Sequence, residues 1–185
     1  MRPPLPRSKT SIFLLPALGL FLAGCGDPEK SRIPDSNLGA QSASASLMAE
    51  KAEVTRLAHA FMGALSARDT ARLDELLAPH AALFSIREAE EGPAYGIRTR
   101  EEFLGGLAQG DADFLERIWE PTVEVTGRIG MVWAPYDFHS DGVFSHCGVD
   151  VLAFLKMAEG WKVTSVTYNV VREGCPASPL GAPGG

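Results

Sequence analysis

Residues 128–172 read RIGMVWAPYDFHSDGVFSHCGVDVLAFLKMAEGWKVTSVTYNVVR, and this stretch decides the fold. Three apolar runs, at 128–139, 143–157 and 161–172, are separated by Ser-Asp-Gly at 140–142 and by Ala-Glu-Gly at 158–160. Glycine supplies the positive φ that tight hairpin turns require. The pattern therefore predicts three consecutive antiparallel strands, in which two hairpins share the middle strand.

Side chains alternate between the two faces of a strand, so the turn positions fix which residues share a face. With Asp141-Gly142 and Glu159-Gly160 as two-residue loops, one face is almost wholly apolar: Val132, Ala134, Tyr136, Phe138, Cys147, Val149, Val151, Ala153, Leu155, Val166, Tyr168 and Val170. The other face mixes apolar and polar residues: Trp133, Asp137, His146, Asp150, Leu152, Phe154, Trp161 and Asn169. This register places Asp137 opposite His146, and a one-residue change in a loop would alter every pair.

The first 24 residues are predicted to be a lipoprotein signal peptide. Three basic residues precede the apolar run SIFLLPALGLFLA, which is shorter than a bilayer-spanning helix needs. The run leads into Leu-Ala-Gly-Cys at 22–25, which resembles the lipobox of bacterial lipoproteins. The alternative is a plain signal anchor in which the cysteine is incidental.

The lipobox resemblance implies that Cys25 carries a lipid and becomes the first residue of the mature chain. The chain would then be anchored in the cell envelope with its domain facing the periplasm. Gly26, rather than Asp, follows the cysteine, and this favours the outer membrane. The expected membrane partner is therefore reached through the lipid on Cys25.

The charge of the chain argues against nucleic acid as a partner. The full chain has 17 Lys and Arg against 23 Asp and Glu, and loss of the signal leaves 14 basic residues. An acidic protein of this kind is repelled by phosphate backbones and by anionic headgroups. Attachment to the membrane is therefore expected through acyl chains rather than through a basic surface.

Between the signal and the end of the chain, the sequence predicts one domain of ordinary size, at residues 47–175. Residues 25–46 are rich in Ser, Ala, Pro and Gly and are predicted to be a flexible tether after the lipidated cysteine. Residues 176–185, PASPLGAPGG, are predicted to be a disordered tail. The four histidines show no metal-ligand spacing, so neither a metal nor another cofactor is expected.

Three helices are expected before the final strands. An apolar stripe at three- and four-residue steps begins near Leu47, and Asp69 is placed to cap a short second helix. A strand at 80–88 follows, and Thr99 with Glu102 fits a capping box for the third helix. A long strand is then predicted from 114 to 126, with Pro121 forcing a bulge or an edge position.

This element order, together with five short segments, resembles the nuclear transport factor 2-like superfamily. The segments are AFMGALSARD (60–69), WEPTVEV (119–125), VWAPYDFHSDG (132–142), SHCGVD (145–150) and GWKV (160–163), and they are most similar to the SnoaL-like, or lumazine-binding, branch. The resemblance implies an α+β fold: a cone-shaped, strongly curved antiparallel sheet covered by about three N-terminal helices and enclosing a pocket, often within a homodimer. It does not imply one chemistry, because members include isomerases, dehydratases, cyclases and binding modules.

Ketosteroid isomerase chemistry, known in this superfamily, needs a carboxylate base and a tyrosine hydroxyl. The resemblance places Phe61 and Ser85 at those two positions, and neither side chain can do that work. The remaining catalytic candidates are Asp137 and His146, because a carboxylate that orients an imidazole can make it a general base or acid. The alternative is an ordinary cross-strand ion pair on a solvated face, with helices covering the apolar face instead.

The favoured function is therefore binding of a small apolar or aromatic molecule, or of a protein partner, without catalysis. The alternative is a SnoaL-like enzyme of the isomerase, dehydratase or cyclase class that uses the Asp137–His146 pair. The candidate ligand-binding residues are Phe61, Trp133, Tyr136, Phe138, Asp150, Tyr168 and Asn169. A homodimer through the sheet is also expected.

With Cys25 lipidated, two cysteines remain in an oxidising compartment, and a Cys147–Cys175 disulfide is predicted. The chain would have to turn back at Gly174 to bring the two residues together. The closed loop would stabilise the fold by roughly 3 kcal/mol.

Overall fold

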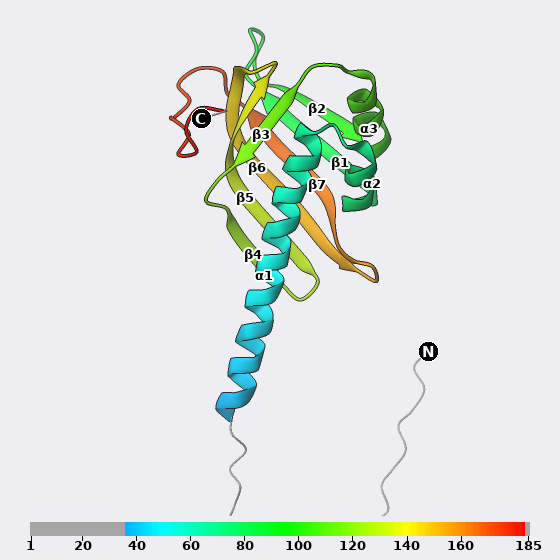
Figure 1. Ribbon diagram of the computed structural model, residues 1–185, viewed down its shortest axis with the longest axis vertical. Helices are drawn as coiled ribbons and strands as arrows, with labels where there is room; N and C mark the ends of the chain where they lie inside the picture. Colours follow the sequence, from blue (N-terminus) through cyan, green and yellow to red (C-terminus); the bar gives the residue numbers. More distant parts are fainter. Residues whose placement is uncertain (1–35, 184–185) are drawn as a thin grey trace, which may run out of the picture. The chain divides into compact units, whose positions relative to one another are not determined.

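The computed structural model describes residues 36–183, which belong to a compact unit that begins at Ser36 (Figure 1). Its ten elements are three helices and seven strands: α1 (Ser36–Ser66), α2 (Thr70–Leu76), β1 (Leu77–Arg87), β2 (Ala94–Thr99), α3 (Arg100–Gln109), β3 (Phe114–Ile118), β4 (Thr122–Thr126), β5 (Ile129–Ser140), β6 (Val143–Met157) and β7 (Gly160–Val170). The predicted signal peptide, the predicted lipid on Cys25 and residues 26–35 lie outside the described residues.

The strands form one curved, mixed sheet in the order β2-β1-β7-β6-β5-β3, with β4 also paired to β5. The predicted α+β class, the three helices and the meander of β5, β6 and β7 are confirmed. The prediction of a wholly antiparallel sheet is wrong at one place, because β1 pairs with β7 in parallel. The first strand therefore lies beside the last strand, and residues far apart in sequence line one surface.

Helices α1 and α3 pack on one face of the sheet, which we call the inner face (Figure 1). Apolar residues of α1, including Val54, Ala58 and Phe61, meet strand residues such as Val132 and Leu152 in a single buried core. The N-terminal ends of the two shorter helices are capped as expected. Asp69 accepts from the main-chain N of Arg72 at 2.9 Å, and α3 begins with the full capping box of Thr99 and Glu102.

Bulges move the strand register away from the predicted pairing. Next to the first turn, His139 pairs with Phe144 as predicted, but Ser145 is an extra residue, so Phe138 pairs with His146 and Asp137 with Cys147. The second hairpin turns at Ala158-Glu159, one residue earlier than predicted, because Gly160 (φ +112°) already pairs with Met157.

These shifts exchange the faces of β6. His146, Asp150, Leu152 and Phe154 lie on the inner face, while Cys147, Val149, Val151, Ala153 and Leu155 lie on the outer face. The predicted apolar face was therefore correct for β5 and for the second half of β7 and wrong for β6.

The edge of the sheet follows the prediction made for Pro121. Strands β3 and β4 are one edge segment broken at residues 119–121, and both parts pair with β5. Glu120 has a φ of +44° at this break. Proline is tolerated here because it donates no main-chain hydrogen bond to a ladder.

The structure describes parts of the two segments that were predicted to be flexible or disordered. Residues 36–46 form the first turns of α1, and the side chains from residue 39 to residue 49 are exposed on a helix that extends past the sheet (Figure 1). Once the packed part of α1 has nucleated, Ala, Ser and Gln extend it at little cost. The tail is described as far as residue 183. It contacts the sheet edge through Gly181 O, which accepts from Arg117 Nη1 at 3.0 Å.

The predicted Cys147–Cys175 disulfide is present, with a Cα–Cα distance of 6.0 Å. Gly174 has the positive φ of +72° that turns the chain back after β7. Just beyond β7, the main chain of Cys147 pairs with that of Val171. Among the helices within residues 36–183, none has the length and apolarity needed to cross a bilayer.

Candidate functional site

A cavity of about 600 Å³ lies between the inner face of the sheet and helices α1 and α3. Its apolar wall is mainly aromatic: Phe61, Phe103, Phe114, Tyr136, Phe138 and Tyr168. The rings pack against one another, with centroids 6.2 Å apart for Phe61 and Phe103 and 5.1 Å apart for Phe114 and Phe138. Such a volume and lining are typical of sites for small organic molecules.

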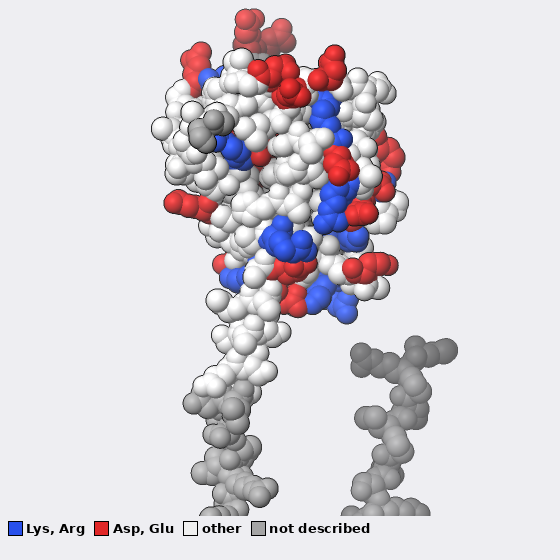
Figure 2. Space-filling view, in the orientation of Figure 1, with Lys and Arg blue, Asp and Glu red and all other residues white. Residues whose placement is uncertain are grey.

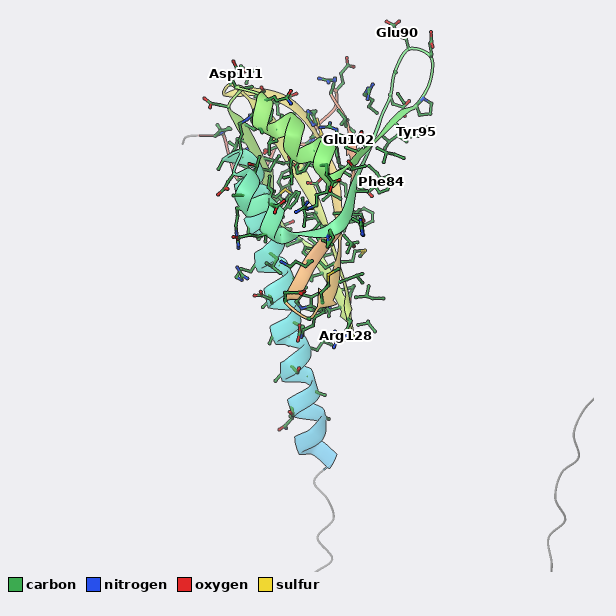
Figure 3. The ribbon with its side chains drawn as sticks, turned by 90° about the vertical axis from the view of Figure 1, so that its right-hand side faces the viewer. Phe84, Glu90, Tyr95, Glu102, Asp111 and Arg128 are labelled. Carbon is green, nitrogen blue, oxygen red and sulfur yellow. A yellow bond between two sulfur atoms is a disulfide. The ribbon has the colours of Figure 1, made fainter. Side chains whose placement is uncertain are left out.

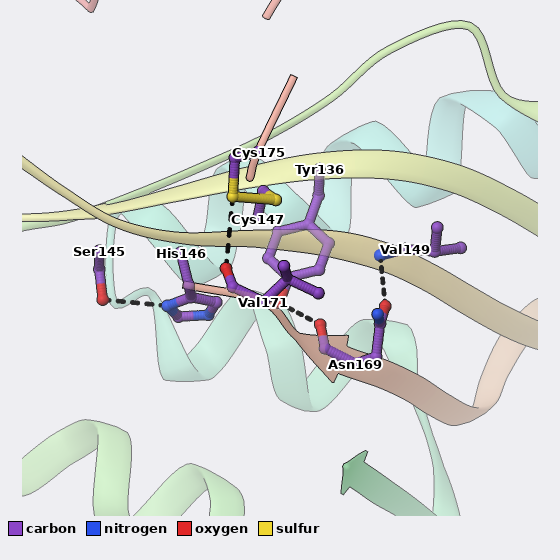
Figure 4. The surroundings of a disulfide bond; sticks show 8 residues. All are labelled: Tyr136, Ser145, His146, Cys147, Val149, Asn169, Val171 and Cys175. Atoms are coloured by element: carbon purple, nitrogen blue, oxygen red, sulfur yellow. Dashed lines mark hydrogen bonds between the residues drawn. A yellow bond between two sulfur atoms is a disulfide. The ribbon is translucent and has the colours of Figure 1, made fainter. Parts of the chain in front are cut away.

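Tyr136 is the central residue of this wall, and its hydroxyl is already used. It donates to the main-chain O of Asn169 at 2.8 Å (Figure 4), and burial first of all raises the pKa of Tyr136 well above its usual range. Room for the ring depends on Gly148, since a Cβ there would lie 2.7 Å from Tyr136 Cε1. The tyrosine is therefore a fixed wall of the cavity rather than a free proton donor.

Two carboxyl groups meet at the floor of the cavity: Glu116 from β3 and Asp150 from β6. Asp150 is 1 % exposed, and within the described residues no N–H or hydroxyl group donates to either of its side-chain oxygens. Glu116 faces the cavity, and its main-chain N donates to Ser66 Oγ at 2.9 Å, which holds that part of β3 against α1.

Burial raises the pKa of the Asp150 carboxyl to about 7, and burial together with the Asp150 charge raises the pKa of Glu116 well above its ordinary range. A proton on Glu116 satisfies Asp150, since a protonated carboxyl can donate to a carboxylate. The two residues therefore form a pair that holds at least one proton at neutral pH.

His146 lies at the same cavity, on β6 beside Phe138. Its ring stacks on Phe138 with centroids 4.9 Å apart, and its Nδ1 is 3.0 Å from Ser145 Oγ. Burial lowers the pKa of His146, and the nearby Arg172 charge lowers it further. The imidazole is therefore neutral at pH 7 and can offer either a donor or an acceptor to a ligand.

The predicted Asp137–His146 pair is not formed, because the shifted register places the two side chains on opposite faces. Asp137 is on the outer face, where Arg117 Nε and Nη2 donate to its two oxygens at 2.8 and 2.6 Å. His139 Nε2 is 3.6 Å from the same carboxylate. Burial would raise the pKa of Asp137, but Arg117 outweighs it and holds the pKa below its usual range. Asp137 thus stabilises the edge of the sheet.

Of the seven candidate ligand-binding residues, the structure brings five to the cavity and leaves two outside it. Phe61, Tyr136, Phe138, Asp150 and Tyr168 line the cavity. Trp133 is on the outer face and is 51 % exposed. Asn169 is structural, since its side-chain oxygen accepts from the main-chain N of Val149 at 2.7 Å (Figure 4).

Sequence reasoning missed Glu116 and the arginines that also line the cavity, Arg68, Arg87, Arg98 and Arg172. A signal for Glu116 was present, because it stands between Phe114 and Ile118 on one face of a predicted strand. An acid between two inward apolar residues is a candidate for a buried functional group. Within residues 36–183, no three His, Cys, Asp or Glu side chains form a metal site.

A family model described as "Putative lumazine-binding" matches residues 49–169 of the chain. The chain belongs to this family. The matched residues contain most of α1, six whole strands and β7 up to its last residue, so the family assignment covers both residues of the acid pair and all of the cavity lining except Val170 and Arg172. No curated protein matches the chain in sequence.

Solved structures of nuclear transport factor 2-like proteins have the fold of this family member. One, from Novosphingobium aromaticivorans, is 16% identical with a TM-score of 0.57, and the match covers 76% of this chain and 94% of that one. A dehydratase, named as putative, from Streptomyces avermitilis is 19% identical with a TM-score of 0.53, over 66% of this chain and 96% of its own.

A third match is the β subunit of an aromatic-ring-hydroxylating dioxygenase, also named as putative, from N. aromaticivorans. It is 12% identical with a TM-score of 0.56, and the match covers 74% of this chain and 97% of that one. At these identities the likeness establishes the nuclear transport factor 2-like, or cystatin-like, fold alone. Function has to be argued from the cavity.

Proposed function

We propose that this chain is a membrane-anchored lipoprotein whose domain binds a small molecule with an apolar or aromatic body in the cavity. The observation that carries the proposal is the cavity of about 600 Å³ walled by six aromatic rings. Packed cores rarely leave such a volume empty, because voids forfeit contacts between atoms. The family description, which names lumazine, a planar heteroaromatic compound, agrees with a ligand of this shape.

The membrane anchor in this proposal is the lipid on Cys25. Its support is the complete Leu-Ala-Gly-Cys sequence after an apolar run. The exposed first turns of α1 would then separate the cavity from the bilayer surface, since a helix rises 1.5 Å per residue. A ligand could enter from the periplasm without first entering the membrane.

A neutral fluorescent probe, N-phenyl-1-naphthylamine, tests the binding function. The mature chain from residue 25 is used with Cys25→Ser, so that no acyl chain competes for the probe. Gly106 lines the cavity and has no heavy atom within 4 Å of an added Cβ, so Gly106→Phe is the variant chosen to place a ring in the cavity. We expect this variant to weaken probe binding by about tenfold or more.

The matched control is Gly105→Phe. Gly105 is the neighbouring residue of α3, also has open space around an added Cβ, and does not line the cavity. Equal probe affinity in Gly105→Phe and Gly106→Phe would contradict binding in the cavity. Mass spectrometry of the purified wild-type protein can also identify a small molecule that co-purifies, and its loss from Gly106→Phe would support the same conclusion.

Acid–base catalysis is a second candidate function, favoured by the buried Glu116–Asp150 pair. An isomerase, dehydratase or cyclase needs a group that exchanges a proton with its substrate, and Glu116 faces the cavity with a raised pKa. This pair replaces Asp137 and His146 as the candidates for that role. Turnover of a co-purified molecule that is lost in Glu116→Gln, with binding retained, would establish catalysis.

We also propose a homodimer through the outer face of the sheet. One row of residues crosses that face in register: Trp133, Val151, Thr167, Phe84 and Ile97. Trp133, Phe84 and Ile97 are 51 %, 37 % and 58 % exposed. Contiguous exposed apolar residues of this kind favour contact with another protein surface. Figure 3 shows Phe84 and Tyr95 on β1 and β2, on the far side of the sheet from the helices.

A further inference from the structure

We propose that the ligand is an organic anion whose negatively charged group binds Arg87, Arg98 and Arg172, while its apolar body contacts the aromatic wall. This inference rests on the proposed function, because it names the chemical class of the molecule that the cavity binds. Three observations support it: these arginines have no partner among the described residues, they lie on one surface, and the cavity has a net positive charge.

Within residues 36–183, every Lys and Arg except these three donates to a partner in the domain. Six donate to carboxylates: Lys51, Arg56, Arg72, Arg100, Arg117 and Lys156. Three donate to main-chain carbonyls: Arg68, Arg128 and Lys162. In the described part of this acidic chain, the cations left without a partner are thus three of the four arginines that line the cavity.

The strand register brings the three arginines to one surface. Arg98 on β2 is opposite Leu83 on β1, and Arg87 at the end of β1 is level with Val170 on β7. Paired residues share a face of the sheet, and Leu83 and Val170 both line the cavity. Arg172 follows Val170 by two residues, so it extends the same row.

The acids of the cavity do not neutralise these arginines. Glu116 and Asp150 share a proton with each other, and the remaining acid of the lining is Asp111. His146 adds no positive charge at pH 7, because burial and Arg172 lower its pKa. The cavity is therefore net positive although the chain has a formal charge of −6. On the face in Figure 2, by contrast, Lys and Arg lie beside Asp and Glu.

Guanidinium groups bind carboxylate, phosphate and sulfonate groups through paired N–H donors. A ligand with an aromatic body and one such group would meet both parts of the cavity at once. Binding of a wholly neutral ligand would leave three like charges at the cavity without a counter-ion from the protein. The chemistry of the cavity therefore favours an amphipathic anion over a neutral aromatic compound.

Two probes that share one scaffold test this inference. 8-Anilinonaphthalene-1-sulfonate has the aromatic body of N-phenyl-1-naphthylamine together with one sulfonate group. With the Cys25→Ser mature chain, we expect the anionic probe to bind about tenfold more tightly at low salt. Raising the ionic strength from about 0.02 M to about 0.3 M should weaken the anionic probe and leave the neutral probe unchanged.

The variant that decides the question is Arg87→Gln combined with Arg172→Gln. It should remove the advantage of the anionic probe while the neutral probe binds as before. Arg128→Gln is the matched control, because Arg128 is at the opposite end of the domain from the cavity residue Asp111 (Figure 3) and should change neither affinity. Displacement by 1-naphthoate or by 1-naphthyl phosphate then distinguishes a carboxylate from a phosphate as the preferred group.

The outcomes separate the two proposals. If the neutral probe binds and Gly106→Phe blocks it, but the anionic probe has no advantage or keeps it in the double variant, the anion inference is wrong and the binding function stands. If neither probe binds wild-type protein, or if Gly106→Phe weakens the binding of neither probe, both proposals are wrong. Failure of both naphthalene anions to displace the sulfonate would also overturn the anion inference.

Discussion

The Glu116–Asp150 pair predicts that the domain loses stability as the pH rises, and Asp150→Asn tests this. Asp150 has a pKa of about 7 in the folded chain, against an ordinary value of 3.8, so the folded state holds an extra proton between these values. The contribution of Asp150 to the free energy of unfolding is therefore greatest at low pH. It falls by about 1.4 kcal/mol per pH unit above the ordinary pKa, until the folded-state pKa is reached. From about pH 5 to about pH 8 the loss is about 3 kcal/mol.

Asparagine has nearly the same shape as aspartate but no titrating proton, so Asp150→Asn should remove this loss. Urea unfolding at several pH values measures the free energy of unfolding, with fluorescence of the buried Trp161 as the signal. As the pH rises from about 5 to about 8, the free energy of unfolding of the variant should increase by about 3 kcal/mol relative to that of wild type. His146 has a lowered pKa and therefore makes stability rise with pH, but it is present in both proteins and cancels in the difference.

Glu90→Gln is the control, because Glu90 is at the exposed tip of the β1–β2 hairpin (Figure 3). Its curve should run parallel to that of wild type. If the Asp150→Asn curve also runs parallel to wild type, Asp150 does not bind an extra proton in the folded state. The floor of the cavity would then hold no shared proton.

Three further predictions concern the anchor, the disulfide and the dimer. Cys25→Ser in the full chain should abolish globomycin-sensitive processing and release the protein from the membrane fraction, and unchanged membrane association would rule out the lipid anchor. Cys147→Ser with Cys175→Ser should lower the free energy of unfolding by about 3 kcal/mol, measured in urea, because the bridge closes a loop across a sequence separation of 28; an equally stable variant would contradict this. Ile97→Lys should halve the mass seen by sedimentation, while Glu90→Lys should not; a monomeric wild type would refute the dimer.

The fold could be predicted from the sequence because its signals are local. Gly142 and Gly160 mark the two hairpins, the Thr99–Glu102 capping box marks α3, and Pro121 marks the break in the edge strand. Each of these signals depends on a few neighbouring residues, which a sequence shows directly. The helical start of α1 was missed because Ala- and Ser-rich sequence does not distinguish a tether from the extension of a helix that is nucleated further along.

The pairing of acid and base groups could not be predicted, because it depends on register. A single extra residue, Ser145, moves the partner of Asp137 from His146 to Cys147, and the period of two then changes the face of every β6 residue after the bulge. No residue type in the sequence announces a bulge at Ser145, in contrast to the glycines at the turns. The disulfide prediction survived the shift because Gly174 lets Cys175 turn back toward Cys147 in either register.

The same bulges shape the cavity. With the predicted register, Asp150 would lie on the face with Trp133 and Asn169, where an unpaired carboxylate could be solvated. The observed register places it level with Tyr168 and with Ala134 on the inner face, where burial raises its pKa and Glu116 becomes its partner. The position of Asp150 in the cavity thus follows from one inserted residue in β6, Ser145. Asp150 costs stability where it lies, and a buried group of this kind is retained most readily when it acts on a ligand.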